Sequence, residues 1–230
     1  MTTTVVIPIK QLQNAKQRLG SLLSVSERAT LFQAMVEDVL EAVTTCDRID
    51  EVLIVTDDEH VALIGHLYGA RVVAEPAVPG LINAVTYAGQ LLSAEGVNTM
   101  MFLPGDVPLV TVEELEVVLD GFGQGTEAAF GIVPASDLGG SNCVVCSPPN
   151  CMNFGFGEDS FRRHLKIAQS LGIKPMVAKL PGIGLDVDTP ADLLELARVL
   201  CRQNLKTHTQ RFLETSGILA NLPADLVGAG

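Results

Sequence analysis

The stretch Leu103-Pro104-Gly105-Asp106-Val107-Pro108-Leu109 decides the fold of this chain. The apolar run Thr99-Met100-Met101-Phe102, which is typical of a strand, leads into it. A buried strand that ends in Gly-Asp places one carboxylate at the carboxyl edge of a sheet, where ligands bind in open α/β folds. Gly105 permits a tight turn or a close backbone approach, and the two prolines stiffen both sides. Asp106 therefore suits a hard cation such as Mg²⁺, which takes one or two carboxylates together with substrate phosphates.

Asp106 has an alternative role as the N-cap of the next helix, because Asp is common at that position. Thr111 with Glu114 already forms a capping box for that helix, which leaves Asp106 free. Asp57 and Asp58 also follow a buried strand and compete as metal ligands. For these two residues we favour helix capping, since Asp is favourable at helix N-termini.

The order of the predicted elements indicates an α/β fold with a mostly parallel sheet. Strands are expected at residues 3–9, 52–56, 71–75, 99–102, 128–134, 141–147 and 176–180, and helices at 24–45, 58–68, 81–94, 111 onward, 160–171 and 190 onward. No helix separates the strands 128–134 and 141–147, so we expect them to form an antiparallel pair that departs from the parallel core. Residues 184–188 are expected to be extended, with Asp186 and Asp188 on one side.

Composition narrows the function. The chain has 230 residues, 47% of them hydrophobic, which fits one sizeable domain with a buried core. Its formal charge of −12 argues against a nucleic-acid partner, which would need a basic face. No apolar run approaches the length of a membrane span and no leader pattern precedes the first strand, so a soluble, cytoplasmic protein is expected.

Five cysteines at irregular spacing fit a reducing compartment. Cys143 and Cys146 imitate a metal-binding CxxC pair, but three residues apart on a strand they point to opposite faces. A zinc site there is a minor alternative, because no second CxxC completes it.

The first loop is basic, although the chain as a whole is acidic. Lys10, Lys16 and Arg18 lie in it, and no acidic residue occurs before Glu27. Such a loop suits an anion, although an ordinary solvated loop is an equal alternative. Together with Asp106 and the pair Asp186 and Asp188, it fits Mg²⁺-dependent phosphoryl or nucleotidyl transfer, in which the protein positions groups and stabilises charge.

Two common nucleotide motifs are missing from the sequence. It contains no G-x-x-x-x-G-K-[ST] P-loop, and no G-x-G-x-x-G follows the first strand. Several separated motifs instead carry a resemblance, in this order: Val5-Val6-Ile7-Pro8-Ile9-Lys10, Ala15-Lys16-Gln17-Arg18-Leu19, the 103–109 stretch, Gly139-Gly140-Ser141-Asn142, Phe156-Gly157, Ser160-Phe161 with His164, and Gly184-Leu185-Asp186-Val187-Asp188-Thr189-Pro190.

From about residue 3 to 200 the chain resembles the guanylyltransferases of coenzyme F-420 biosynthesis. That family activates 2-phospho-L-lactate, phosphoenolpyruvate or 3-phospho-D-glycerate with GTP. The resemblance implies a three-layer Rossmann-like fold of the nucleotide-diphospho-sugar transferase (GT-A-like) type, with an antiparallel insertion. It further implies a nucleotidyltransferase domain over residues 1–203 and a tail, 204–230, packed on it or at the interface of a possible homodimer.

The resemblance also assigns roles. Lys16, Asp106 and Asp188 would be catalytic, and the two carboxylates would hold Mg²⁺. The remaining residues would bind GTP and the small phosphorylated acid: Lys10, Arg18, Asn83, Ser141, Gly157 and Ser160. Gly157 and Ser160 lie near a helix N-terminus, which favours anions.

One position departs from the pattern: Ser141 stands where Thr is expected after the glycines. Ser keeps the hydroxyl and loses a methyl group, so binding is expected to survive while the choice of acid can change. We favour 3-phospho-D-glycerate or phosphoenolpyruvate over phospholactate.

Two alternatives stay open. A nucleotidyltransferase of the same fold could act on a molybdopterin, a sugar phosphate or a polyol phosphate. It would be expected to carry a glycine-rich loop after the first strand, whereas here the first glycine is Gly20. A non-catalytic nucleotide sensor is the other alternative, and loss of the metal carboxylates is what would produce one.

Overall fold

A seven-stranded sheet forms the centre of the molecule. The structure, a computed structural model, describes residues 2–122, 127–203 and 206–218. The strand order is β3-β2-β1-β4-β6-β5-β7. The strands are β1 (Thr3–Pro8), β2 (Glu51–Val55), β3 (Arg71–Val73), β4 (Thr99–Phe102), β5 (Ala129–Pro134), β6 (Ser141–Ser147) and β7 (Met176–Val177). β6 runs antiparallel to both β4 and β5, whereas the pairs β1–β2, β1–β4, β2–β3 and β5–β7 are parallel.

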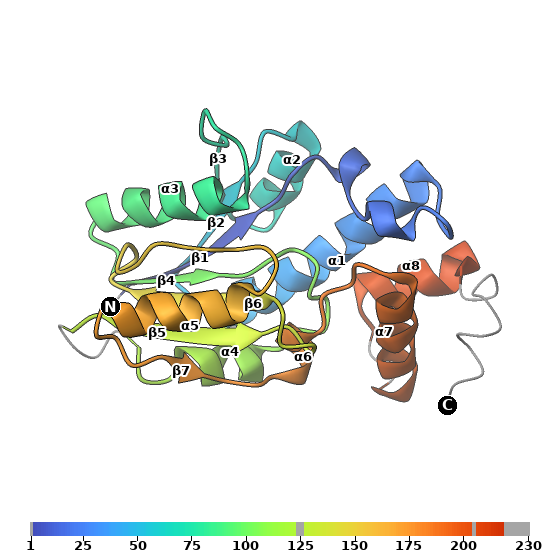
Figure 1. Cartoon of the computed structure of the whole chain (residues 1–230). Helices are drawn as coiled ribbons and strands as arrows, with labels where there is room; N and C mark the ends of the chain where they lie inside the picture. The colour runs from blue at the N-terminus through green and yellow to red at the C-terminus, as the bar shows by residue number, and fades with distance from the viewer. Residues whose placement is uncertain (1, 123–126, 204–205, 219–230) are drawn as a thin grey trace.

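Helices cover both faces of this sheet. They are α1 (Val25–Thr45), α2 (Glu59–Leu67), α3 (Leu81–Ala94), α4 (Val112–Leu119), α5 (Ser160–Ser170), α6 (Pro181–Gly184), α7 (Pro190–Gln203) and α8 (His208–Ser216), with short 3-10 turns η1 (Leu12–Asn14) and η2 (Gln17–Leu19). Alternation along β1 explains the layers, because Val5 and Ile7 pack with α1, α2 and α4 while Val6 packs with α3 and α5. Figure 1 shows α3 and α5 in front of the sheet and α1 behind it. The predicted three-layer α/β fold with an antiparallel insertion is confirmed.

Several local signals for the helix starts are also confirmed, but two predicted caps are wrong. The Glu114 carboxylate accepts from Gly182 and Ile183 instead of completing a capping box with Thr111, and Asp57 accepts the N–H of Glu75 instead of capping α2. The Ser24 hydroxyl and the Glu27 carboxylate form the reciprocal capping box of α1. Thr111 accepts the N–H of Glu114 at the start of α4, so Asp106 is not the cap of that helix. Asp58 caps α2 by accepting two backbone N–H groups, as expected.

Gly105 allows α1 to pack closely against the turn that follows β4. A Cβ atom at this position would lie 2.9 Å from a methyl group of Val36 and 3.6 Å from Ile9. The glycine in the 103–109 stretch therefore allows the close backbone approach that the sequence suggested, and α1 is the element that approaches.

Two predicted segments differ in the structure. The strand expected at 176–180 covers only Met176–Val177, because β7 lies at the edge of the sheet and pairs with β5 alone. The segment expected to be extended from residue 184 begins instead with the short helix α6, and only Leu185 onward is extended. The carboxylate of Glu114 causes this turn by accepting the N–H groups of Gly182 and Ile183 at 2.7 and 2.8 Å.

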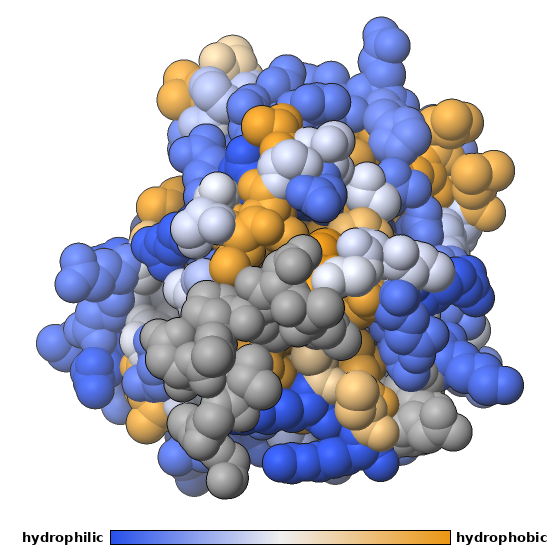
Figure 2. All heavy atoms as spheres, turned by 90° about the vertical axis from the view of Figure 1, so that its right-hand side faces the viewer, coloured by the Kyte–Doolittle hydropathy of each residue, from blue (hydrophilic) through white to orange (hydrophobic). Residues whose placement is uncertain are grey.

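The described part of the C-terminal tail lies on the domain. α8 packs against α1, and Asp38 of α1 accepts the backbone N–H groups of His208 and Thr209 at 2.6 and 3.0 Å. Burial raises the pKa of Asp38, and these hydrogen bonds oppose that effect. Figure 2 shows this end of the molecule, where mostly hydrophilic side chains surround a smaller group of hydrophobic ones. A dimer interface through the tail stays a prediction, and residues 219–230 lie outside the described residues.

Within the described ranges, no helix combines the length and the apolar character that crossing a bilayer requires. Cys143 and Cys146 of β6 are both fully buried, and they pack into the cores on opposite faces of the sheet.

Candidate active site

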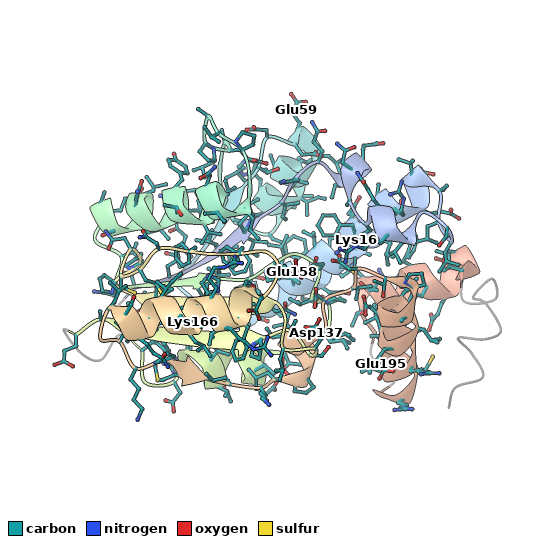
Figure 3. All side chains as sticks on the ribbon, viewed as in Figure 1. Lys16, Glu59, Asp137, Glu158, Lys166 and Glu195 are labelled. Atoms are coloured by element: carbon teal, nitrogen blue, oxygen red, sulfur yellow. The ribbon has the colours of Figure 1, made fainter. Side chains whose placement is uncertain are left out.

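A cavity of about 730 Å³ opens at the carboxyl edge of the sheet. Asp106, just beyond the end of β4, lines it together with Ser141 and Gly157. The reversed direction of β6 explains this arrangement, since its first residue, Ser141, meets the ends of the parallel strands. Figure 3 shows Lys16, Asp137 and Glu158, from three separate segments, gathered in the region between the sheet and α7.

Lys16 joins two carboxylates that are far apart in the sequence. Its Nζ donates to Asp106 Oδ2 at 2.5 Å and to Asp188 Oδ1 at 2.7 Å, and its side chain is only 4% exposed. The backbone of Lys16 is left-handed, with φ of 52°. That conformation costs a non-glycine residue about 1–2 kcal/mol, so the surrounding contacts hold it in place.

A hydrophobic cluster aligns these three segments. Leu19, beside Lys16 and Arg18, and Val187, beside Asp188, are both fully buried in one core with the first turns of α1 and with α7. The Val187 N–H also donates to the Asp106 carbonyl at 3.0 Å. Burial of the apolar neighbours thus fixes the positions of the charged side chains.

Lys16 stays charged in this position. Burial alone lowers the pKa of its ammonium, but the negative charges of Asp106 and Asp188 and their hydrogen bonds outweigh burial, so the net shift is upward. The ammonium also lies 5.4 Å from the centre of the Phe32 ring, a favourable cation–π distance.

Asp186 adds a third carboxylate to the cavity wall. Asn142 Nδ2 donates to its Oδ1 at 3.0 Å and also to the Ile183 carbonyl. Burial raises the pKa of Asp186, and the charges of Asp106 and Asp188 raise it further, while the Asn142 hydrogen bond opposes the shift. The sequence indicated that Asp186 shares a side with Asp188, but gave it no separate role.

Acidic side chains dominate the lining of the cavity: Asp106, Asp137, Glu158, Asp159, Asp186, Asp188 and Asp192. Arg18 is the basic side chain in the same lining, 75% exposed and 3.9 Å from Asp188. Lys16 supplies one further positive charge through its two ion pairs. A polyphosphate would therefore meet net negative charge here unless a cation entered with it.

Asp106 and Asp188 fit a hard divalent cation. Asp106 Oδ1 is buried and has no hydrogen-bond partner among the described residues, although a buried carboxylate oxygen is costly to leave unpaired. Carboxylate oxygens on two converging segments are the ligand type that Mg²⁺ takes alongside substrate phosphates. The unpaired oxygen is what a bound cation would satisfy.

Another part of the lining contains a neutral network of hydroxyl groups beside the carboxylates of Glu158 and Asp159. Ser160 Oγ donates to Ser141 Oγ at 3.1 Å, and His164 Nδ1 lies 2.9 Å from the same Ser141 oxygen. Gly157, with φ of 108°, leads into the start of α5, where Asp159 makes no side-chain capping bond. The N-terminus of α5 thus lines the cavity without a side-chain acceptor from its N-cap, and its dipole favours an anion there. The N–H groups of Ser160 and Phe161 already donate to the carbonyls of Gly157 and Gly139.

A family model described as guanylyl transferase CofC like matches residues 3–222. The chain belongs to this family. The family expected from the sequence is thereby confirmed, and the chain is an enzyme of the guanylyltransferase class.

Curated relatives of this CofC-like chain carry three substrate names. A phosphoenolpyruvate guanylyltransferase of Sphaerobacter thermophilus is 31% identical, over 86% of this chain and 93% of the relative. A 3-phospho-D-glycerate guanylyltransferase of Colwellia psychrerythraea is 34% identical, over 86% and 92%. A 2-phospho-L-lactate guanylyltransferase of Methanothermobacter thermautotrophicus is 31% identical, over 85% and 84%.

A solved structure from Desulfovibrio desulfuricans G20, described as a candidate nucleotide-diphospho-sugar transferase, matches with a TM-score of 0.76. It covers 96% of this chain and 98% of its own, at 18% identity. At that identity the match supports the fold alone.

Six of the nine site residues expected from the CofC-like resemblance line the main cavity, and Lys16 reaches it through its ion pairs with Asp106 and Asp188. Two lie elsewhere. Asn83 is exposed and lines an adjoining hollow of about 420 Å³, which shares Phe156 and Gly157 with the main cavity. Lys10 is exposed and is absent from the lining of either space.

His164 is the polar residue that the sequence placed but gave no role. Its spacing of four residues from Ser160 on a predicted helix was the available signal. That spacing could show a shared face, but it could not show that this face is buried against Ser141.

Proposed function

We propose that this chain transfers GMP from GTP to a small phosphorylated acid, releasing pyrophosphate, with Mg²⁺ bound by Asp106 and Asp188. One observation carries the proposal: a charged group and a hydroxyl group of side chains line the same cavity of about 730 Å³. We call Asp106, Asp186 and Asp188 with Lys16 the charged wall, and Ser141 with Ser160 the hydroxyl wall. The first suits a metal-bound triphosphate and the second suits an acid. The product, a guanosine diphosphate-linked acid, would serve coenzyme F-420 synthesis.

In the proposed reaction, a phosphate oxygen of the acid attacks the α-phosphorus of GTP. A new P–O bond forms while the bond to the β-phosphate breaks, and pyrophosphate leaves with its electron pair. Mg²⁺ would neutralise the phosphate oxygens and stabilise the leaving pyrophosphate. Lys16 and Arg18 would add positive charge beside the transferred group, and such preorganised charge is a large part of phosphoryl-transfer catalysis.

The hydroxyl wall would hold the acid. Ser141 would donate its hydroxyl hydrogen to the carboxylate or phosphate of the acid, and Ser160 would hold the Ser141 oxygen by donating to it. The backbone at Gly157 and the start of α5 would add N–H groups. Relatives with three different acid names are 31–34% identical to this chain, so overall identity does not select one acid. We favour 3-phospho-D-glycerate or phosphoenolpyruvate, as the sequence suggested.

Pyrophosphate release tests this proposal directly. GTP and Mg²⁺ are incubated separately with 3-phospho-D-glycerate, phosphoenolpyruvate and 2-phospho-L-lactate, and ATP and CTP replace GTP in parallel wells. We expect release with GTP and one of the first two acids, and loss of release with a chelator. Release that is independent of the acid, or silence with all three acids while GTP binds, would contradict the proposal.

A further inference from the structure

His164 lies outside the set of residues that would touch GTP or the acid, yet it is bonded to the hydroxyl wall. We propose that His164 is a positioning residue for the phosphorylated acid. Its Nδ1–H would hold Ser141 Oγ as an acceptor and so turn the Ser141 hydroxyl hydrogen toward the cavity. The inference rests on the proposed function, because it assumes that an anionic acid is the ligand of Ser141.

The hydrogen bonds of His164 fix its tautomer. The backbone N–H of Gly155 donates to Nε2 at 2.9 Å. A backbone amide can only donate in this contact, so Nε2 must carry a lone pair and the proton of the neutral ring must be on Nδ1. Burial lowers the pKa of His164 to about 4, with a smaller contribution from the charge of Arg163. The ring is therefore neutral near pH 7, with Nδ1 as its donor.

This tautomer determines the direction of the Ser141 hydroxyl. Ser141 Oγ accepts from His164 Nδ1 at 2.9 Å and from Ser160 Oγ at 3.1 Å. Both lone pairs of the oxygen are then occupied, and its own hydrogen must point to a third partner. Ser141 lines the cavity, so an oxyanion placed there would receive this hydrogen.

Aromatic rings keep the imidazole in place. The centres of the Phe156, Phe130 and Phe154 rings lie 4.9, 6.3 and 6.4 Å from that of His164, and the side chain is fully buried. These contacts restrict the orientation of the imidazole, so that Nδ1 stays directed at Ser141. The Nε2 contact supports the backbone at Gly155, which is a structural task, whereas the Nδ1 contact orients Ser141, which is a positioning task.

The two amide isosteres of histidine separate these tasks. In His164→Asn the side-chain amide can occupy the place of Nδ1 and keep the donor to Ser141, but nothing accepts the Gly155 N–H. In His164→Gln the amide reaches the place of Nε2 and keeps that acceptor, but the donor to Ser141 is lost. Urea unfolding measures the structural task, and the KM for the acid measures the positioning task.

We expect the two readouts to rank the variants in opposite order. His164→Gln should raise the KM for phosphoenolpyruvate or 3-phospho-D-glycerate about tenfold, the loss expected for one hydrogen bond to a charged group. Its kcat and its KM for GTP should stay within about threefold, while His164→Asn should keep the acid KM within about threefold and unfold more readily. In a Ser141→Ala background, His164→Gln should add no further rise in the acid KM.

Three results would overturn the inference: an unchanged acid KM in His164→Gln, an acid KM that rises equally in both variants or more in His164→Asn, or a full further rise in the Ser141→Ala background. If either variant does not fold, ¹⁵N spectra of histidine-labelled wild-type protein decide the matter. The Nδ1–H tautomer at pH 7 and a shift of Nδ1 on adding the acid would support the inference, and an Nε2–H tautomer or imidazolium would overturn it. Failure of the proposed function is distinct, because the wild type would then release no pyrophosphate with any acid.

Discussion

The two walls of the cavity are held by different interactions, ion pairs in one and neutral hydrogen bonds in the other. The charged wall joins Asp106 and Asp188 through the ammonium of Lys16, and Asp186 adds a third carboxylate to the same lining. The hydroxyl wall joins Ser141 and Ser160 with His164 in a neutral, buried network. Charges respond to added cations, salt and pH, whereas a satisfied neutral network keeps one geometry over a wide range of conditions. The charged wall can therefore rearrange when a ligand binds, whereas the hydroxyl wall is already ordered without one.

The largest effect should come from removing a charge that a cation would need. We expect Asp106→Asn to lower kcat about 10³-fold, since metal-assisted charge stabilisation contributes several kcal/mol. Pyrophosphate release at saturating Mg²⁺ measures this change. Asp137→Asn, another acidic residue of the same lining, is the matched control and should retain most of the activity. Near-wild-type turnover in Asp106→Asn would show that this carboxylate pairs with Lys16 but does not bind the metal.

Lys16→Met tests whether the ammonium competes with a metal ion, because Lys16 already bonds the two carboxylates that a cation would use. The substitution keeps the length of the side chain and removes its charge. Turnover should fall about 10²-fold for want of positive charge beside the phosphates. The affinity for Mn²⁺ without nucleotide should rise about tenfold, because the ion no longer competes with an ammonium.

Titration with Mn²⁺, followed by paramagnetic resonance or calorimetry, measures this affinity. Lys166→Met removes an equal charge from an exposed position on α5 and should change neither quantity. Weaker Mn²⁺ binding in Lys16→Met would show that the ammonium supports the metal site instead of competing with it.

His164, which bonds the hydroxyl wall, should make the free energy of unfolding depend on pH. The pKa of His164 is about 4 in the folded state, below its ordinary value of 6.5. The unfolded chain therefore binds more protons between these values, and this residue destabilises the folded state as the pH falls from 6.5 toward 4. From pH 7 to pH 5 its share of the loss is about 2 kcal/mol. Urea unfolding at both pH values should show a loss smaller by that amount in His164→Asn. Parallel losses in the two proteins would exclude the shifted pKa.

The smallest effect is expected at the exposed rim. Arg18→Gln should raise the KM for GTP about fivefold at low ionic strength and less at high ionic strength, because an exposed charge is screened by salt. Lys10→Gln makes the same charge change outside the lining of the cavity and should stay within about twofold. Equal effects of the two substitutions would indicate that Lys10 binds phosphate after all, as the sequence predicted.

Local signals in the sequence predicted local structure well. The capping box of Ser24 and Glu27 and the cap at Asp58 each depend on residues within a single turn, so the sequence contains all the partners. The position of Asp106 followed in the same way from a buried strand and the turn after it. The family motifs supplied the remaining candidates, and most of them do converge.

What the sequence could not provide depends on distant partners. Lys16 meets Asp106 and Asp188 across 90 and 172 residues, and the pairing requires the sheet and the hydrophobic cluster around Leu19 and Val187 to be in place. The turn at α6 needs the carboxylate of Glu114, 68 residues earlier. The buried face of His164 needs β6 beside α5. None of these contacts has a signal in spacing or composition.

The reversed strand β6 makes the enzyme modular. Residues 139–164 supply Ser141, Gly157, Ser160 and His164 from one continuous piece of chain, whereas Lys16, Asp106 and Asp188 come from three pieces held by the parallel core. Selectivity for the acid can therefore diverge by exchange of a single cassette, with the nucleotide chemistry left intact. A chimera that receives this cassette from a relative with a different acid name should change its substrate and keep its use of GTP.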